Sequence, residues 1–395
     1  MRVLHNIMPG KSSTKKKYYP LVSVCTPTFN RRPFIPTMFQ CFKNQTYPKD
    51  RIEWIIVDDG TDKIQDLISA SGISQIKYVS VEKKMYLGAK RNLMHSHCKG
   101  SIIVYMDDDD YYPPDRIEHA VERLLDNPAA MCAGSSEIYI YFKHIKRMIQ
   151  FGPYQKNHAT AGTFAFRAEL LKTSKYEETA ALAEERAFLK DYSVPFVQLD
   201  PMKTILCFSH EHNTFDKRRL LEAGYNDYMK ESPKTVEHFI KNTSEASIKK
   251  FFMEEVDGLL LNYAPGEPKM KPDVLKQIDE ILEERRKEME KEQAQNAKIV
   301  LQRPGEAPME ISPTQAVEIM KAQQQEIAKR DARIAELEKV IQRLLDNKGT
   351  PVENSKVAPP SPPSPPSQHI NNLSKTNPAI KSEPAFKISD FAKKN

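Results

Sequence analysis

The sequence has few cysteines, and none of them has the spacing of a metal or disulfide framework. Its 395 residues include five cysteines, an odd number scattered over positions 25, 41, 98, 132 and 207. No pair has the Cys-x-x-Cys spacing of zinc sites or thiol redox motifs. We therefore expect no zinc site and no disulfide framework, but reduced thiols in a cytoplasmic compartment.

Long hydrophobic runs are also missing. No apolar stretch approaches the ~18–20 residues that a membrane-spanning helix needs. The charged segment from Met1 to Lys17 lacks the apolar centre of a signal peptide. The net charge is only +6, from 59 basic and 53 acidic residues, without the clustered basic face that nucleic-acid binding needs. The sequence thus predicts a soluble cytoplasmic protein with no transmembrane segment and no nucleic-acid partner.

What the sequence does contain, from about residue 21 to 207, is an alternation of short β-type runs and longer amphipathic stretches. The runs predict strands at 22–26, 54–57, 76–80 and 101–106, and the stretches predict helices at 36–44, 63–71, 87–98 and 116–125. A period-two pattern at 137–142 predicts a hairpin with 147–151. Strands that alternate with helices pair in parallel. The expected fold class is therefore α/β, with an open, mainly parallel sheet and flanking helices.

Composition divides the chain into four parts. We expect a basic arm at 1–18, a folded domain at 19–265 that ends in a helical extension after 215, charged helices at 266–346, and a Pro/Ser/Lys-rich tail at 347–395. The tail is too poor in apolar residues to build a core and is expected to be disordered.

A heptad pattern occupies the third part. Met320, Ile327, Ile334 and Ile341 recur every seven residues. Leu337 and Leu344 fill the two later d positions, whereas Gln323 and Arg330 occupy the two earlier ones. The pattern predicts either a short coiled coil that makes a homo-oligomer through 314–345, or a single solvated amphipathic helix.

Polar groups follow three of the predicted strands. The segments are Pro27–Arg31, Asp58–Thr61 and the four consecutive acids Asp107–Asp110, which Pro113 and Pro114 follow. Parallel strands place their carboxyl ends on one edge of a sheet, where ligands of open α/β folds bind. With the basic segment 90–92 alongside, these groups predict a site for an anionic ligand held through a metal. Hard oxygen ligands favour Mg²⁺ or Mn²⁺.

Five segments, in this order, resemble the nucleotide-binding half of glycosyltransferase family 2. They are 22–31, 45–48, 55–61, 88–92 and 105–110. The resemblance covers about residues 21–215, with the nucleotide-binding half at about 21–112 and the acceptor half at about 113–215. It implies a GT-A fold and metal-dependent transfer of a sugar from a nucleoside-diphosphate donor, most often UDP, to an acceptor hydroxyl with inversion. The acceptor could be a glycan, a protein or a lipid.

The resemblance also implies a role for individual residues in donor binding. Phe29 would lie against the base, with Pro27, Thr28 and Arg31 on the same loop. Asp59 would accept a hydrogen bond from the base, and Arg91 and Asn92 would support the diphosphate. Asp107 and Asp109 would be the two ends of an Asp-x-Asp motif that contacts the sugar and the metal. Asp108 joins the donor-binding set, although in a regular strand Asp108 and Asp110 would point to the opposite face and fix the loop.

Catalysis and metal binding are implied further along the chain. The family's base is usually the Asp of a Glu-Asp pair that opens a helix, and the matching residues here are Glu184 and Glu185, in a predicted helix at about 179–190. Glu185 is the preferred base and Glu184 the second choice; an exposed acidic helix face is the alternative. A His-x-x-Asn segment makes His210 the preferred metal or diphosphate contact, with His212 as the alternative. The segment 160–166 resembles the floor of the acceptor site.

Two other functions compete with this hypothesis. An Asp-x-Asp phosphohydrolase would need Thr or Val two residues after its second acid, where Tyr111 and Tyr112 intervene. A non-catalytic adaptor would use the coiled coil and the proline-rich tail on a degenerate transferase domain, but the acids are intact.

Overall fold

The computed structural model describes residues 17–182, 184–223, 225–296, 299–302 and 307–346. The predicted tail and almost all of the predicted basic arm lie outside these residues. The described chain forms two compact units, one up to Ile281 and one from Leu282 onward.

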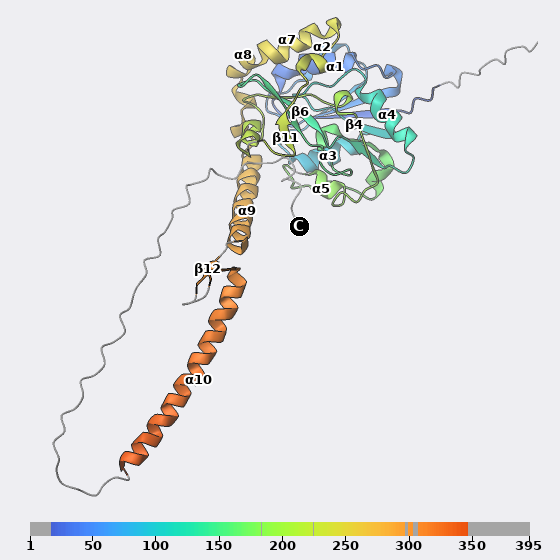
Figure 1. The fold of residues 1–395 in the computed structure, drawn as a ribbon. Coiled ribbons are helices and arrows are strands. Elements are labelled where there is room, and N and C mark those ends of the chain that lie inside the picture. The colour runs from blue at the N-terminus through green and yellow to red at the C-terminus, as the bar shows by residue number, and fades with distance from the viewer. Residues whose placement is uncertain (1–16, 183, 224, 297–298, 303–306, 347–395) are drawn as a thin grey trace, which may run out of the picture. The chain divides into compact units, whose positions relative to one another are not determined.

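A seven-stranded sheet forms the centre of the first unit (Figure 1). Its order is β3-β2-β1-β4-β8-β5-β9, from strands β1 (Val22–Thr28), β2 (Ile52–Asp58), β3 (Ile76–Ser80), β4 (Ile102–Tyr105), β5 (Cys132–Gly134), β8 (Ala165–Arg167) and β9 (Phe196–Gln198). The pairs β2–β3, β1–β2 and β1–β4 are parallel, and β8 is antiparallel to both of its neighbours. The predicted α/β class with a mainly parallel sheet is confirmed.

Helices connect these strands as the sequence predicted. They are α1 (Ile35–Lys43), α2 (Gln65–Ser71), α3 (Leu87–Ser96) and α4 (Arg116–Asp126). In α4 the buried apolar residues fall at 117, 120, 121 and 124, the spacing of a single helix face. The strands β1, β2 and β4 are almost completely buried, because helices cover both faces of a parallel sheet.

A second, four-stranded sheet has the order β10-β6-β7-β11. The predicted hairpin is β6 (Ile138–Phe142) with β7 (Arg147–Phe151), flanked by β10 (Cys207–Ser209) and β11 (Met229–Glu231). The short helices α6 (Val236–Phe239), α7 (Ala246–Lys250) and α8 (Val256–Leu261) follow. Aromatic side chains of this part, such as Phe208 stacked on Phe252 with ring centroids 4.3 Å apart, form a second hydrophobic core.

The predicted helix at 179–190 is wrong for most of its length. Only α5 (Glu185–Phe188) is helical. Upstream, the backbone groups that a helix would use are bonded elsewhere. The N–H of Gly88 donates to Ala180 O at 2.9 Å, and the N–H of Ala181 donates to Gln277 Oε1 at 2.9 Å. Tertiary contacts therefore override the local helix preference.

Two long helices end the described chain. Helix α9 runs from Pro272 to Asn296 and crosses from the first unit into the second. After the antiparallel pair β12 (Ile299–Leu301) and β13 (Met309–Ile311), α10 runs without interruption from Pro313 to Asp346 (Figure 1). Its start is a capping box, in which Ser312 and Gln315 each accept a hydrogen bond from the other's backbone N–H. No described helix is long and apolar enough to cross a membrane.

Candidate active site

A cavity of about 280 Å³ gathers most of the predicted site residues at the carboxyl ends of β1 and β4. Eight of them line it: Pro27, Phe29, Arg31, Arg91, Asp107, Asp108, Asp109 and Glu184. They come from four separate stretches of sequence, which meet because β1 and β4 are parallel neighbours and α3 packs beside them. We call this cavity the donor pocket.

The acid cluster does not continue the strand. Strand β4 ends at Tyr105, and the four aspartates follow it in a bend. Asp107, Asp108 and Asp109 all line the donor pocket. The expectation that Asp108 points away from its two neighbours is therefore wrong, because the period-two rule holds only inside a strand. Asp110 lies apart, 3.6 Å from Lys217 Nζ, and accepts the N–H of Phe208.

Asp109 lies between Arg31 and His210. Its Oδ2 is 3.2 Å from Arg31 Nη2 and 3.5 Å from His210 Nε2. Burial alone would raise the pKa of Asp109, but the Arg31 guanidinium and a hydrogen bond from His210 lower it well below its usual range. Burial lowers the pKa of His210 to about 4, so its imidazole is neutral at pH 7, the form that binds metals. Geometry favours His210 over His212 as the group beside the acids.

Asp107 is the carboxylate with spare bonding capacity. Its Oδ1 is buried and has no hydrogen-bond partner among the described residues. A side chain at Gly162 would put its Cβ 2.7 Å from Asp107 Oδ2, so this glycine lets the backbone of the 160–166 segment approach the acid. Burial raises the pKa of Asp107 above its usual value. A buried acceptor without a donor is costly, which is a feature expected of a group that awaits a cation or a ligand.

The two glutamates have different surroundings. Glu184 is buried and accepts a 2.8 Å hydrogen bond from Arg91 Nε. Glu185, the first residue of α5, forms no ion pair with any residue that the structure describes. Burial, followed by the negative charge of Glu184, raises the pKa of Glu185 to about 8.

Asp59 and Phe29 lie among three lysines, of which the sequence analysis pointed only to Lys90, in the basic segment 90–92. Asp59 pairs with Lys90 and accepts the N–H of Met85 at 2.6 Å, so both of its oxygens have partners. The Phe29 ring lies 5.6 Å from Lys84 Nζ, 5.9 Å from Lys90 Nζ and 5.6 Å from Lys271 Nζ. Lys90 falls inside the matched segment 88–92, but Lys271 lies far beyond every motif, and no sequence signal pointed to it.

The remaining predicted residues do not line the donor pocket. Thr28 is buried, and its carbonyl accepts a hydrogen bond from Lys90 Nζ at 3.2 Å. The side chain of Asn92 bonds both the N–H and the carbonyl of Tyr176, at 3.0 and 2.9 Å. It therefore holds the 176 segment against α3. The carbonyl of His212 accepts from Arg31 Nη1 at 2.8 Å, so His212 orients the arginine through its backbone.

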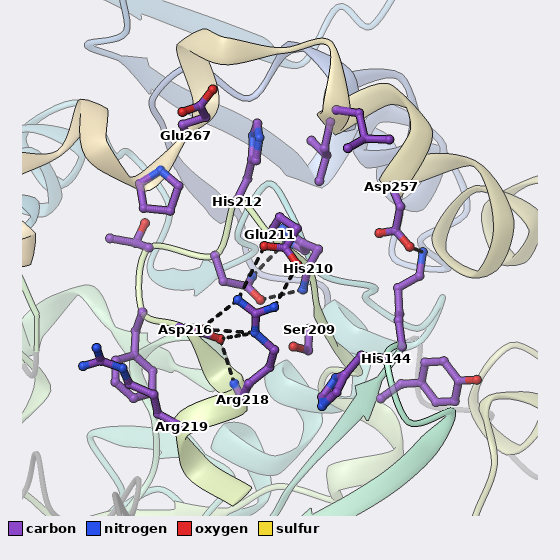
Figure 2. Close-up of a pocket in the computed structure, with 18 of the residues that line it drawn as sticks. His144, Ser209, His210, Glu211, His212, Asp216, Arg218, Arg219, Asp257 and Glu267 are labelled. Carbon is purple, nitrogen blue, oxygen red and sulfur yellow. Dashed lines mark hydrogen bonds and ion pairs between the residues drawn. The ribbon is translucent and has the colours of Figure 1, made fainter. Parts of the chain in front are cut away.

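Residues 209–216, His210 among them, line a second, larger cavity of about 1140 Å³. Figure 2 shows Arg218 at its centre, bonded to Glu211 and Asp216, and Lys143 pairs with Asp257 at 2.9 Å. Because these charges are satisfied by one another, they select no particular ligand chemistry.

No three His, Cys, Asp or Glu side chains in the described part of the chain already surround one point as a metal site would. The pair Asp109 and His210 comes nearest to such a metal site, but Arg31 also contacts the Asp109 carboxylate and would compete with a metal ion for it. The donor set of two aspartates and a neutral imidazole nevertheless fits a hard divalent ion, because Asp107 keeps an unpartnered oxygen.

Known proteins resemble parts of this chain. Residues 23–187 match the family described as Glycosyl transferase family 2. The protein TuaG of Bacillus subtilis is 30% identical over 114 residues, which cover 28% of this chain and 44% of that protein. An uncharacterized glycosyltransferase of Rickettsia prowazekii is 32% identical over 112 residues, covering 28% and 34%. The matched segment thus spans less than half the length of either relative.

Two solved structures are also similar. TarS of S. aureus in complex with UDP has a TM-score of 0.38 and 18% identity, and the match covers 61% of this chain and 75% of that one. The mannosyltransferase PcManGT of Pyrobaculum calidifontis, with GDP-Man and Mn²⁺, has a TM-score of 0.42 and 18% identity, covering 68% and 76%.

The sheet, the acid-lined pocket at its carboxyl edge and the sequence match define one class of protein. Residues 23–187 carry the similarity to that class, which is glycosyltransferase family 2.

Proposed function

We propose that this protein is a metal-dependent glycosyltransferase that moves a sugar from a nucleoside-diphosphate donor, with UDP the expected nucleotide, to an acceptor hydroxyl with inversion. The observation that carries the proposal is the donor pocket itself. There Phe29 and Arg31 from the end of β1, Arg91 from α3 and the acids after β4 line one cavity. An aromatic ring, cations and carboxylates together suit a ligand with a base, a diphosphate and a sugar.

The pocket supports a division of roles among these groups. Phe29 gives the base a flat apolar surface, and Asp59 lies beside it, although Lys90 and Met85 already use its oxygens. Arg31 and Arg91 supply positive charge at the acid cluster. Both are held in place by carboxylates, Arg31 by Asp109 and Arg91 by Glu184. Such pre-positioned charges need little rearrangement when an anion binds.

Asp107, Asp109 and His210 are the proposed holders of the ion, Mn²⁺ or Mg²⁺. When bound, it would offset the charge that develops on the departing diphosphate. In the protein alone Asp109 is shared with Arg31 at 3.2 Å, so the ion has a competitor for this ligand. We therefore expect tight ion binding only when the nucleotide, itself a source of oxygen ligands, is present.

Glu185 is the proposed base that takes the proton of the acceptor hydroxyl. Its raised pKa of about 8 and the absence of a described ion pair give it the basicity and freedom that the role needs. Glu184 is neutralised by Arg91 and lines the donor pocket, which fits a positioning role. The acceptor class, whether glycan, protein or lipid, and the cytoplasmic location remain predictions.

Titration calorimetry with UDP and GDP, each with and without MnCl₂, tests the proposal. We expect one nucleotide to bind and Mn²⁺ to strengthen that binding. The variant Asp109→Ala should lose the Mn²⁺-dependent part. Asp126→Ala, which removes an exposed carboxylate from the end of α4, is the matched control and should bind like the wild type. A panel of nucleotide sugars assayed for donor hydrolysis would then identify the sugar.

A wild-type protein that binds neither nucleotide would contradict the proposal and favour the non-catalytic adaptor. If Asp109→Ala still bound the nucleotide in an Mn²⁺-dependent way, the donor site would stand but Asp109 would not be a metal ligand.

A further inference from the structure

The cations that line the donor pocket are almost all paired. Five cations face it, and four of them contact a carboxylate: Arg31 with Asp109, Lys84 with Asp273, Lys90 with Asp59 and Arg91 with Glu184. The fifth is Lys271. Among the described residues it has no carboxylate within ion-pair distance.

Lys271 has only a neutral partner for its charge. Its Nζ donates to Thr214 Oγ1 at 2.6 Å and lies 5.6 Å from the centre of the Phe29 ring. Burial, and after it the positive charge of Arg31, lower the pKa of Lys271 well below its usual value. A buried ammonium without an anion is unfavourable. Within the described part of the chain, Lys271 therefore lacks the carboxylate partner that each of the other four cations has.

The first turns of α9 hold Lys271 in this position. Asp273 pairs with Lys84 at 2.6 Å, and Gln277 bonds the N–H of Ala181 and the carbonyl of Thr179, at 2.9 and 2.8 Å. On the same stretch of α9, Val274 and Ile278 are buried and line the donor pocket. The start of α9 is thus attached on both sides of the pocket and supplies part of its wall.

We propose that Lys271 binds the diphosphate of the donor, so that a residue 84 positions beyond the family-matched segment 23–187 completes the donor site. The inference rests on the proposed function. A diphosphate is the anion that suits this place, because Lys271 lies near both Arg31 and the acid cluster. The acid cluster would hold the metal ion that accompanies a diphosphate. The uracil or guanine base carries no negative charge that would need Lys271.

The test compares Lys271→Met with Lys271→Arg and with the control Lys276→Met. Methionine keeps much of the apolar stem and removes the charge, whereas arginine keeps the charge. Lys276 lies on the same helix, is 78% exposed and pairs only with Glu280 at 3.6 Å among the described residues. UDP and uridine are titrated into each protein in the presence of MnCl₂, with GDP and guanosine as the pair if GDP is the nucleotide that the wild type binds.

We expect Lys271→Met to weaken nucleoside-diphosphate binding at least ~10-fold, the loss expected for a charge-assisted hydrogen bond. The affinity for the nucleoside, which has no phosphate, should stay the same. Lys271→Arg should recover most of the lost affinity, and Lys276→Met should match the wild type.

Two results would overturn the inference while leaving the donor site intact. One is wild-type affinity of Lys271→Met for the diphosphate. The other is an equal loss for diphosphate and nucleoside, which would show that Lys271 only supports the shape of the pocket through Thr214. A wild-type protein that binds neither nucleotide would overturn the proposed function, and this inference with it.

Discussion

Glu184 and Glu185 are neighbours in sequence with different electrostatic surroundings. Arg91 neutralises Glu184 at 2.8 Å. The negative charge of Glu184 and the burial of Glu185 together make the second carboxylate hard to ionise, and its pKa rises to about 8. A carboxylate of that pKa is a stronger base than an ordinary one, but below pH 8 most molecules hold it protonated and inactive.

This difference predicts how transfer depends on pH. At saturating donor and acceptor, the transfer rate should rise with pH, by up to tenfold per unit below pH 8, and level off above it. Glu185→Gln should abolish transfer and leave UDP affinity unchanged. Glu184→Gln removes the charge that helps to raise the pKa of Glu185, so it should move the inflection of the profile to lower pH.

The measurement is a series of initial rates between pH 6 and pH 9.5 for the three proteins. A flat profile, or an inflection that Glu184→Gln leaves in place, would contradict the assignment of Glu185 as the base. If Glu185→Gln instead weakened UDP binding, the residue would belong to the structure of the pocket.

Sequence alone could predict the residues that a local pattern marks. The acids 107–109, Phe29 and Arg31 follow strands whose apolar runs are evident, and parallel pairing then brings them together. It could not predict that Asn92 turns its amide to the backbone of Tyr176, or that Lys271 enters the pocket. Both facts depend on contacts between residues more than 80 positions apart, which no local period records.

At the scale of elements, the start of α9 and the 177–182 segment depend on each other. Gln277 uses its side chain to bond backbone groups on both sides of Ala180. This exchange replaces the start of the helix that the sequence predicted at about 179–190, because backbone groups of Thr179 and Ala181 are already bonded. The strands and helices with a strong apolar period were predicted within a few residues, whereas this irregular segment depends on a distant partner.

Asp273 does not line the donor pocket, but its ion-pair partner Lys84 does, so their contact predicts an effect on donor binding. Asp273→Asn weakens the ion pair that fixes α9 beside the loop at 82–86. A partly exposed pair contributes up to about 1 kcal/mol, which corresponds to an affinity loss of about fivefold for UDP. Calorimetric titration at 50 mM and 500 mM NaCl measures it, and high salt should reduce the difference between variant and wild type.

Glu280→Gln is the control, because it removes the same charge from the exposed side of the same helix. If both variants lost affinity equally, net charge would be the cause and not the attachment of α9.

At the scale of the whole molecule, α10 presents an apolar stripe that no described residue covers. Its 34 residues include no buried side chain. Met320, Ile327, Ile334, Leu337, Ile341 and Leu344 are each between 46% and 63% exposed. An isolated helix gains little stability in water, and most helices depend on packing of an apolar face. Pairing with α10 of a second copy would bury these side chains, so we propose a homo-oligomer through 314–345.

The double variant Ile334→Glu/Ile341→Glu tests this proposal. It places two like charges per chain at a positions, where burial against a partner helix would be most unfavourable. We expect light scattering after size exclusion to give the mass of an oligomer for the wild type and of a monomer for the variant. Ala335→Glu/Ala328→Glu, which introduces the same residue twice at b positions of the heptad, should remain an oligomer.

The residues that line the donor pocket run from 27 to 278 and all belong to the first unit. The monomeric variant should therefore bind UDP with the affinity of the wild type. If monomerisation also removed UDP binding, the oligomer would be part of the donor site itself. If the wild type were already a monomer at ~50 µM, the stripe on α10 would not pair with a second copy, and a single solvated helix, the other structure that the heptads allow, would describe it.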